Sequence, residues 1–425
     1  MLSYMKLFKR QISVEETPPE DDREAAIQAE EAEVKHFWES KRDWFSEKGY
    51  TLFKFECLRS SIPLLDTPSL NVESSEYPYA FCGGDLPYPD SEVLEAYNSE
   101  KVCFAQDQQG RHVSIKKLSK EDETRIYHLL FEKRKSLAEN SILPIIEILE
   151  YKDLCFVVTP RWGDGPFFCG RISIRDILHY IRCLLKAIYF LHSNCIVHRV
   201  SVAMACDHML VLTKSIKDLK DDNTLVNHFG AYCRNRRNEM RPKLRSAGKL
   251  TYVLFDFDLA LLLPSTECRL PSRVSFYVMT AIIPFDTSHG ELDYDPYKFE
   301  MGCLGIFLCE TFQHYIPSIP FLAPLFDRLI TDKLELRFTA EEALQFFDQM
   351  HAKLSPQQLS LDAPIDIDSI IPFWEPEKHD RWEGLPEEFV KEWGHFRAPK
   401  PSLYTRFLRR ISLAYSHVSP TCLKK

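Results

Sequence analysis

The spacing of apolar residues changes near residue 160, and this change constrains the fold more strongly than any other feature of the sequence. Before it, apolar residues come in short runs bounded by polar or turn-forming residues, which is typical of β-strands. After it, residues 174–191 place apolar side chains every three or four positions, which indicates a long amphipathic helix. The order predicts an α+β protein of two lobes with a ligand-binding cleft between them. The short runs are residues 101–106, 111–118, 143–149 and 154–159.

Turn-forming residues mark the joints between these elements. Residues 108–110 (QQG) fit a hairpin turn between the first two strands, and residues 121–139 fit a helix. Two prolines and two glycines within residues 160–166 predict a hinge. Ser173 followed by Asp176 approximates a capping box at the start of the long helix.

The two ends of the chain differ from the middle. Residues 15–33 hold nine carboxylates against one arginine, so we expect residues 1–35 to be a disordered acidic tail. Residues 36–94 are interpreted as an N-terminal extension. Residues 351–425 are interpreted as a C-terminal extension, in which Trp374, Trp382, Trp393 and Phe396 are expected to pack back on the preceding part.

Composition narrows the function classes. A net charge of −9 argues against a general nucleic-acid-binding protein, because such proteins carry a basic surplus. The 13 cysteines show no metal-ligand spacing and are expected to be reduced thiols. We find neither a signal-peptide pattern nor a run of about 18 apolar residues that could span a membrane. We therefore expect a cytoplasmic protein without a transmembrane segment, and a nuclear location is also compatible.

Five short motifs occur in one order along the chain and resemble those of eukaryotic protein kinases. Their kinase counterparts are V-A-I-K, L-H-x-x-x-I-V-H-R, V-L-I-D-F-G-L-A, D-V-W-S-L-G and R-x-T-A-x-E-A-L. The resemblance covers roughly residues 95–350. Residues 295–300 (DPYKFE) and the Trp44…Tyr50 segment are similar to kinase-like proteins of mushroom-type fungi. In this chain the five motifs are residues 113–116 (VSIK), 191–199 (LHSNCIVHR), 253–260 (VLFDFDLA), 298–305 (KFEMGCLG) and 337–344 (RFTAEEAL).

The resemblance implies a bilobal protein-kinase-like fold with a small β-rich N-lobe, residues 95–160, and a large, mainly helical C-lobe, residues 161–350. In the family, the lysine matched by Lys116 neutralises nucleotide phosphates, and the aspartate matched by Asp256 binds magnesium. A helix glutamate pairs with that lysine. Glu132 is the candidate for it, whereas a second alignment places Leu130 there.

The catalytic loop departs from the family pattern H-R-D-x-K-x-x-N. His198 and Arg199 are retained, but direct spacing puts Val200, Val202 and Ala205 at the aspartate, lysine and asparagine positions. In kinases these three residues position the attacking hydroxyl, neutralise the transferred phosphate and hold a second magnesium ion. All three functions fall on apolar side chains here.

A second alignment leaves a substitute for the base open. If His208 replaces the asparagine, the loop is three residues longer and Asp207 lies beside it. A carboxylate there could accept the proton only if it lies about 3 Å from the substrate hydroxyl.

Two further departures concern phosphate and metal binding. The glycine-rich loop of the family is missing, since the turn expected at residues 97–100 contains no glycine. The glycine after the metal-binding aspartate is replaced by Asp258. Asp256 and Asp258 together could bind a cation, or Asp258 could cap the loop or face solvent.

A kinase-like protein that has lost its catalytic base is the interpretation these residues favour. We expect a catalytically impaired pseudokinase that acts as a binding or scaffold module with a protein partner, with ATP and Mg²⁺ binding weakly or not at all. A nucleotide remains a candidate ligand. The alternative is a divergent, active Ser/Thr protein kinase that transfers the γ-phosphate of ATP with Asp207 as its base.

Residues 213–250 form a basic insertion in this scheme. Its residues 234–249 carry seven Lys and Arg side chains against Glu239 and contain no aromatic residue. Binding of bases by stacking needs aromatic side chains. We therefore expect a solvated loop and no nucleic-acid partner.

Overall fold

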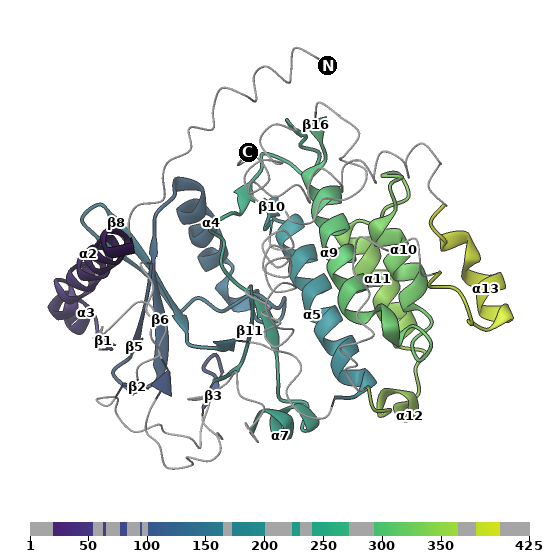
Figure 1. Cartoon of the computed structure of the whole chain (residues 1–425), viewed down its shortest axis with the longest axis horizontal. Helices are drawn as coiled ribbons and strands as arrows, with labels where there is room; N and C mark the ends of the chain where they lie inside the picture. Colours follow the sequence, from purple (N-terminus) through teal and green to yellow (C-terminus); the bar gives the residue numbers. More distant parts are fainter. Residues whose placement is uncertain are drawn as a thin grey trace.

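The protein has a mixed architecture in which an antiparallel sheet lies at one end and a group of helices at the other (Figure 1). This arrangement comes from a computed structural model and agrees with the α+β class expected from the sequence. The residues that the structure describes are 20–53, 63–64, 77–82, 94–95, 101–164, 172–199, 223–229, 240–271, 293–363 and 380–399.

Five strands form the sheet in the order β1-β5-β6-β8-β7. The strands expected over 101–106, 111–118 and 154–159 are confirmed within one residue at each end. The strand expected from residue 143 begins at Glu147 instead, because the backbone N–H of Leu143 donates to Leu254 O at 3.0 Å. The bounds are β1 (Thr51–Leu52), β5 (Val102–Gln106), β6 (His112–Leu118), β7 (Glu147–Tyr151) and β8 (Leu154–Pro160).

The hairpin between β5 and β6 fixes the register that places Lys116. Gly110 has φ 75°, a left-handed conformation that glycine adopts at little cost, and its N–H donates to Asp107 O at 2.9 Å. Val102 pairs with Lys116 across the two strands. The expected turn is confirmed.

Two helices, α2 (Glu20–Glu39) and α3 (Arg42–Glu47), cover the outer face of the sheet (Figure 1). Trp38 and Phe45 are buried there against Phe156 of β8, with ring centroids 5.9 and 5.2 Å from that of Phe156. The expected disordered tail overlaps this helix over residues 20–35, which are helical because Glu and Ala have high helix propensity. Residues 1–19 lie outside the described residues.

The inner face of the sheet contacts α4 (Glu121–Glu132), whose Ile126 and Leu130 are fully buried. The helix expected over 121–139 therefore ends early. Lys133 leaves the helical conformation with φ −96° and ψ 13°, and a short 3₁₀ turn (Arg134–Ser136) follows. This break lets the chain return towards the sheet.

Four longer helices build the helical part: α5 (Ile174–His192), α9 (Pro296–Phe312), α10 (Leu322–Ile330) and α11 (Ala340–His351). The start of α5 is as expected, since the N–H of Ser173 donates to Asp176 Oδ2 at 2.8 Å. Asp295 caps α9 by accepting from two backbone N–H groups, and α9 is buried on nearly all sides. Among the described helices, none is long and apolar enough to cross a membrane.

Short strands connect the sheet to the helices. One small sheet has the order β13-β11-β9, and β10 pairs with β14. Three further pairs are β12 with β3, β15 with β16 and β2 with β4. The bounds are β2 (Pro63–Leu64), β3 (Phe81–Cys82), β4 (Leu94–Glu95), β9 (Gly163–Asp164), β10 (Ile196–Val197), β11 (Thr224–Val226), β12 (His228–Phe229), β13 (Tyr252–Leu254), β14 (Leu261–Leu262), β15 (Leu270–Pro271) and β16 (Asp293–Tyr294).

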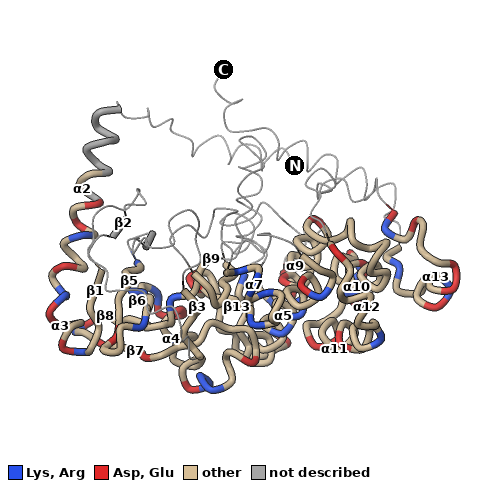
Figure 2. The backbone as a smooth tube through the Cα atoms, turned by 90° about the horizontal axis from the view of Figure 1, so that it is seen from below, with Lys and Arg blue, Asp and Glu red and all other residues tan. Residues whose placement is uncertain are grey.

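The described part of the basic insertion is ordered and partly buried, so the expectation of a solvated loop is wrong there. Besides β11 and β12, it contains α7 (Met240–Ser246). Arg241 is only 1% exposed and donates to His228 O at 3.0 Å. A buried guanidinium must be paired or hydrogen-bonded, and this strand carbonyl supplies that partner. Figure 2 shows basic residues along α7.

The C-terminal extension packs against α10, as expected for its aromatic residues. It contains α12 (Pro356–Leu359) and α13 (Glu387–Trp393), and α13 lies at the far end of the molecule from the sheet (Figure 1). Asp327 of α10 accepts from Arg381 Nη1 at 2.5 Å, from Trp382 Nε1 at 2.8 Å and from Ala398 N at 2.9 Å. Trp374 and residues 400–425 lie outside the described residues.

Candidate functional site

Lys116 of β6 is the centre of a charged cluster between the sheet and the helices. Its side chain is 13% exposed, and its Nζ lies 2.6 Å from Asp256 Oδ1, 2.5 Å from Asp258 Oδ1 and 2.8 Å from Glu123 Oε1. One ammonium group therefore contacts three carboxylates. The sequence had pointed to Lys116, Asp256 and Asp258, and the structure brings these three together.

The carboxylates come from two elements on the helical side of the sheet. Glu123 lies in the first turn of α4, where a negative charge is favoured by the helix dipole. Asp256 and Asp258 follow β13, and Asp256 has φ 64°. A non-glycine residue in this left-handed region is uncommon and occurs often at functional sites. The turn directs both aspartates towards Lys116.

Two further lysines contact Asp258. Lys101 Nζ donates to Asp258 Oδ2 at 2.5 Å, and Lys120 Nζ donates to the Asp258 carbonyl oxygen at 2.7 Å. Both carboxylate oxygens of Asp258 are thus bonded to ammonium groups, one to Lys116 and one to Lys101. Only 20% of the Asp258 side chain is exposed, so its carboxylate points into the cluster and not into solvent.

The ionisation of the cluster follows from these contacts. Burial alone would lower the pKa of Lys116, but Tyr127, Asp256, Glu123 and Asp258 outweigh burial and raise it. Burial favours the neutral form of Asp258, yet Glu123, Lys116 and Lys101 hold its pKa below the ordinary value. The pKa of Glu123 is raised, first by burial and then by its contact with Asp258. Of Glu123 and Asp258, Glu123 is therefore the carboxyl that takes up a proton first.

The three carboxylates have the spacing of metal ligands, but lysines already occupy the space between them. Oxygens of Glu123, Asp256 and Asp258 lie within 4.8 Å of one another. Divalent cations bind such oxygens at about 2.0–2.6 Å. Because Lys116 Nζ lies at 2.5–2.8 Å from one oxygen of each, a magnesium ion does not fit the cluster as it is arranged.

A cavity of about 450 Å³ opens beside the cluster. This volume falls within the usual range for sites that bind small molecules. Lys101, Lys116, Asp256 and Asp258 form its charged end. The rest of the wall is mostly apolar and comes from β5, β8, β11, the segments before β7 and after β13, and the link between β8 and β9: Val102, Phe104, Leu143, Val157, Trp162, Leu225 and Phe255.

The glutamate that pairs with Lys116 is Glu123, not Glu132. Glu132 is exposed at the C-terminal end of α4, and the alternative, Leu130, is buried in the core. A glutamate in the first turn of the helix that follows the lysine strand was the signal that could have pointed to Glu123. The family spacing led past it because α4 begins directly after β6, which places its first turn beside Lys116.

His198 and Arg199 are held by Glu300 of α9. The Glu300 carboxylate is 1% exposed and accepts from His192 Nε2 at 2.8 Å, from His198 N at 3.2 Å and from Arg199 N at 2.5 Å. His198 Nε2 donates to Phe255 O at 2.9 Å, which ties this segment to the chain before Asp256. Burial lowers the pKa of His198, so its imidazole is neutral at pH 7.

The remaining candidate residues lie outside the described residues. These are Val200, Val202, Ala205, Asp207 and His208, together with the turn at 97–100. Arg199, the last described residue before this gap, has φ 65°.

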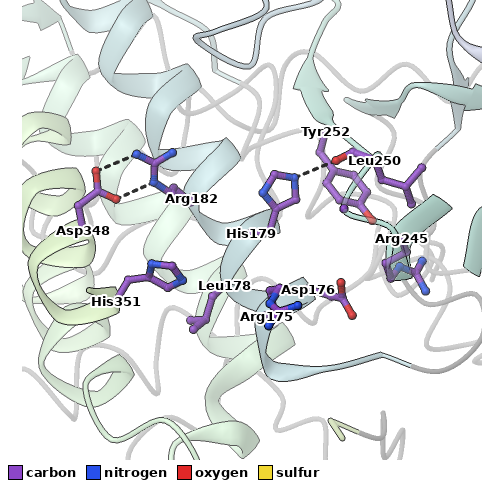
Figure 3. Close-up of a pocket in the computed structure, with 11 residues that line it drawn as sticks. Arg175, Asp176, Leu178, His179, Arg182, Arg245, Leu250, Tyr252, Asp348 and His351 are labelled. Atoms are coloured by element: carbon purple, nitrogen blue, oxygen red, sulfur yellow. Dashed lines mark hydrogen bonds and ion pairs between the residues drawn. The ribbon is translucent and has the colours of Figure 1, made fainter. Parts of the chain in front are cut away.

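A second cavity, of about 570 Å³, lies between α5, α7 and α11 (Figure 3). Several of its polar groups are already hydrogen-bonded within the protein. Arg182 donates to Asp348 through two bonds of 2.7 and 3.0 Å, and His179 Nε2 donates to Leu250 O at 3.0 Å. This cavity shares no residue with the Lys116 cluster.

Comparisons of the sequence with protein-family models and with curated proteins found no match. The site is therefore interpreted from its own geometry and from the motifs in the sequence.

Proposed function

We propose that the chain is a kinase-like protein that does not transfer phosphate and acts as a binding or scaffold module for a protein partner. In this proposal the sheet with α4 corresponds to the N-lobe of a bilobal kinase-like fold, and the helical part corresponds to the C-lobe. The order of the five motifs supports it, as does the convergence of Lys116 and Asp256 beside a cavity.

The observation that carries the proposal is the engagement of Lys116 by three carboxylates. In the family a single helix glutamate pairs with the phosphate-binding lysine, which leaves that ammonium able to face the phosphates as well. Here Asp256, Asp258 and Glu123 each contact that ammonium at 2.5–2.8 Å. A phosphate chain would have to displace at least one carboxylate and then lie beside it, where like charges repel. This arrangement favours weak or absent nucleotide binding.

The sequence of the catalytic loop supports the same conclusion. Val200 stands at the position of the base, and loss of a positioned general base costs about 10²–10⁴ in rate. Kinases turn over at about 1–100 s⁻¹. The expected phosphotransfer rate is therefore below about 1 s⁻¹ before any loss of metal or phosphate binding is included.

A phosphotransfer assay tests the proposal. The purified full chain is incubated with ATP carrying a labelled γ-phosphate, Mg²⁺ and generic protein substrates, alongside an Asp207→Ala variant. We expect no transfer above background in either protein, and no nucleotide-dependent shift in melting temperature with or without Mg²⁺. Transfer at rates of ordinary kinases that disappears in Asp207→Ala would instead establish the alternative, an active kinase with a relocated base.

A further inference from the structure

We propose that Lys101 and Lys116 serve as built-in counter-cations of the Glu123, Asp256 and Asp258 cluster, and that the two lysines together exclude divalent metal ions from it. This inference rests on the proposed function, because it concerns the same site. It adds a cause for the weak or absent Mg²⁺ binding that the proposed function expects: Lys116 fills the space between the carboxylates, and Lys101 covers Asp258 Oδ2 and adds a second positive charge.

The first argument is the occupancy of the oxygens. Asp258 Oδ1 and Oδ2 each lie 2.5 Å from an ammonium nitrogen, of Lys116 and Lys101 respectively. Asp256 Oδ1 accepts a hydrogen bond from Lys116, and Glu123 Oε1 lies 2.8 Å from the same nitrogen as an ion pair without a hydrogen bond. Glu123 Oε2 is 3.4 Å from the N–H of Ser119. A hard cation needs about six oxygen ligands, and four carboxylate oxygens of this cluster already lie within ion-pair distance of an ammonium nitrogen.

The second argument is charge. Two ammonium groups carry the same total charge as one divalent ion, and they are attached to the protein. A divalent ion placed among these carboxylates would lie a few ångströms from both ammonium nitrogens, and the repulsion would offset its attraction to the oxygens. The carboxylates alone would attract such an ion, so the lysines determine the preference.

The third argument is that Lys101 can be removed without dismantling the cluster. Lys116 contacts all three carboxylates and is 13% exposed, whereas Lys101 contacts only Asp258 and is 31% exposed. The backbone of Lys101 is held separately, since its carbonyl accepts from Lys117 N at 2.7 Å. Loss of the Lys101 side chain therefore frees Asp258 Oδ2 and lowers the positive charge by one, while the sheet register stays fixed.

The test is Mn²⁺ binding to the full chain, measured by isothermal titration calorimetry. We expect no binding to the unmodified chain up to about 1 mM and at least about tenfold tighter binding to Lys101→Met, because one repelling charge is gone. Lys101→Arg, which keeps the charge, should remain closed to Mn²⁺. The double variant Lys101→Met/Asp258→Asn should lose the gained binding, since the freed oxygen is no longer a carboxylate.

Lys133→Met is the matched control, because it removes the same charge from an exposed lysine outside the cluster. It should bind Mn²⁺ no better than the unmodified chain. If Lys101→Met melts at a much lower temperature, Lys101→Gln provides the same test with a polar side chain.

Two outcomes would overturn the inference. One is equal Mn²⁺ affinity in the unmodified chain and Lys101→Met. The other is a gain in Lys101→Met that Lys133→Met reproduces or that Asp258→Asn does not remove. Neither outcome bears on phosphotransfer, which the assay above measures independently, so failure of this inference and failure of the proposed function are distinguishable.

Discussion

Replacement of Lys116 by methionine removes the ammonium group at the centre of the cluster and keeps a side chain of similar length. Three carboxylates then face each other, and among the described contacts Lys101 alone still bonds one of their carboxylate oxygens, Asp258 Oδ2. Breaking a buried ion pair by removing one partner costs about 3–5 kcal/mol, because the other charge is left uncompensated. The loss should be spread unevenly over the three carboxylates.

The burial of each carboxylate decides where the loss falls. The Asp256 side chain is 38% exposed, so solvent screens it and its share is small. Asp258 keeps its bond to Lys101. The Glu123 side chain is fully buried and loses the ammonium nitrogen that lies 2.8 Å away. We therefore expect a decrease of about 3 kcal/mol in the free energy of unfolding at pH 7.5, the lower end of the range.

The decrease should depend on pH, with a sign fixed by Glu123. Its pKa is already raised in the folded protein, and loss of Lys116 raises it further. A carboxyl with a raised folded pKa destabilises the protein increasingly as pH rises from its unfolded pKa, about 4.3, through its folded pKa. The stability lost in Lys116→Met should thus be partly recovered as pH falls from 7.5 to 5. Asp258 has a lowered pKa, so it stays ionised over this interval and contributes no change.

Urea unfolding at pH 5 and pH 7.5, followed by circular dichroism, measures both quantities. The Lys116→Met/Glu123→Gln double variant should recover most of the loss at pH 7.5, because the uncompensated charge is gone. Lys133→Met controls for the change in net charge. A deficit that is the same at both pH values and is unchanged by Glu123→Gln would refute the assignment of the loss to Glu123.

Two further predictions concern the helical part. A Cβ added at Gly305 would lie 2.5 Å from Leu329 Cβ and 2.9 Å from Ile330 Cγ2, so Gly305→Ala should force α9 and α10 apart and lower the free energy of unfolding by about 1–3 kcal/mol in urea unfolding. Asp327→Ala leaves the buried Arg381 guanidinium without its carboxylate and should cost about 3–5 kcal/mol, with limited proteolysis cutting within residues 380–399 first.

Each of these two predictions has a control of the same chemistry. For Gly305, the control is Gly394→Ala, where an added Cβ meets only Val390 Cγ1 at 3.9 Å and should change little. For Asp327, the control is Asp122→Ala on the exposed side of α4, which lies in a surface ion pair worth under about 1 kcal/mol. Equal effects in variant and control would contradict the packing and ion-pair arguments.

The regular elements were predictable because their signals are local. The alternation around Lys116, the turn at Gly110 and the Ser173–Asp176 cap each need only a few neighbouring residues, and the structure reproduces all three. Three members of the charged cluster, Lys116, Asp256 and Asp258, were also predicted from short motifs. Local chemistry sufficed for these.

The partners of those residues were harder to predict, because they depend on where each helix begins and on how the strands are paired. Neither is fixed by a short motif. Glu123 pairs with Lys116 only because α4 begins directly after β6. Lys101 joins the cluster through the register of β5 against β6. The sequence predicts a solvated charge for Arg241. In the structure its guanidinium is buried and donates to the carbonyl oxygen of His228 in a neighbouring strand.

Because both extensions pack against the rest of the protein, the part of the chain that must fold together is longer than the part that contains the five motifs. A fragment restricted to residues 95–350 would keep all five motifs. It would also uncover Phe156, against which Trp38 and Phe45 pack, and the Asp327 carboxylate, which Arg381 neutralises and Trp382 hydrogen-bonds. Such a fragment would expose apolar surface at one end of the molecule and an unpaired charge at the other. Newly exposed apolar surface of this kind favours aggregation. The folding unit thus includes parts of both extensions, with Trp38 and Phe45 at one end and Arg381 and Trp382 at the other.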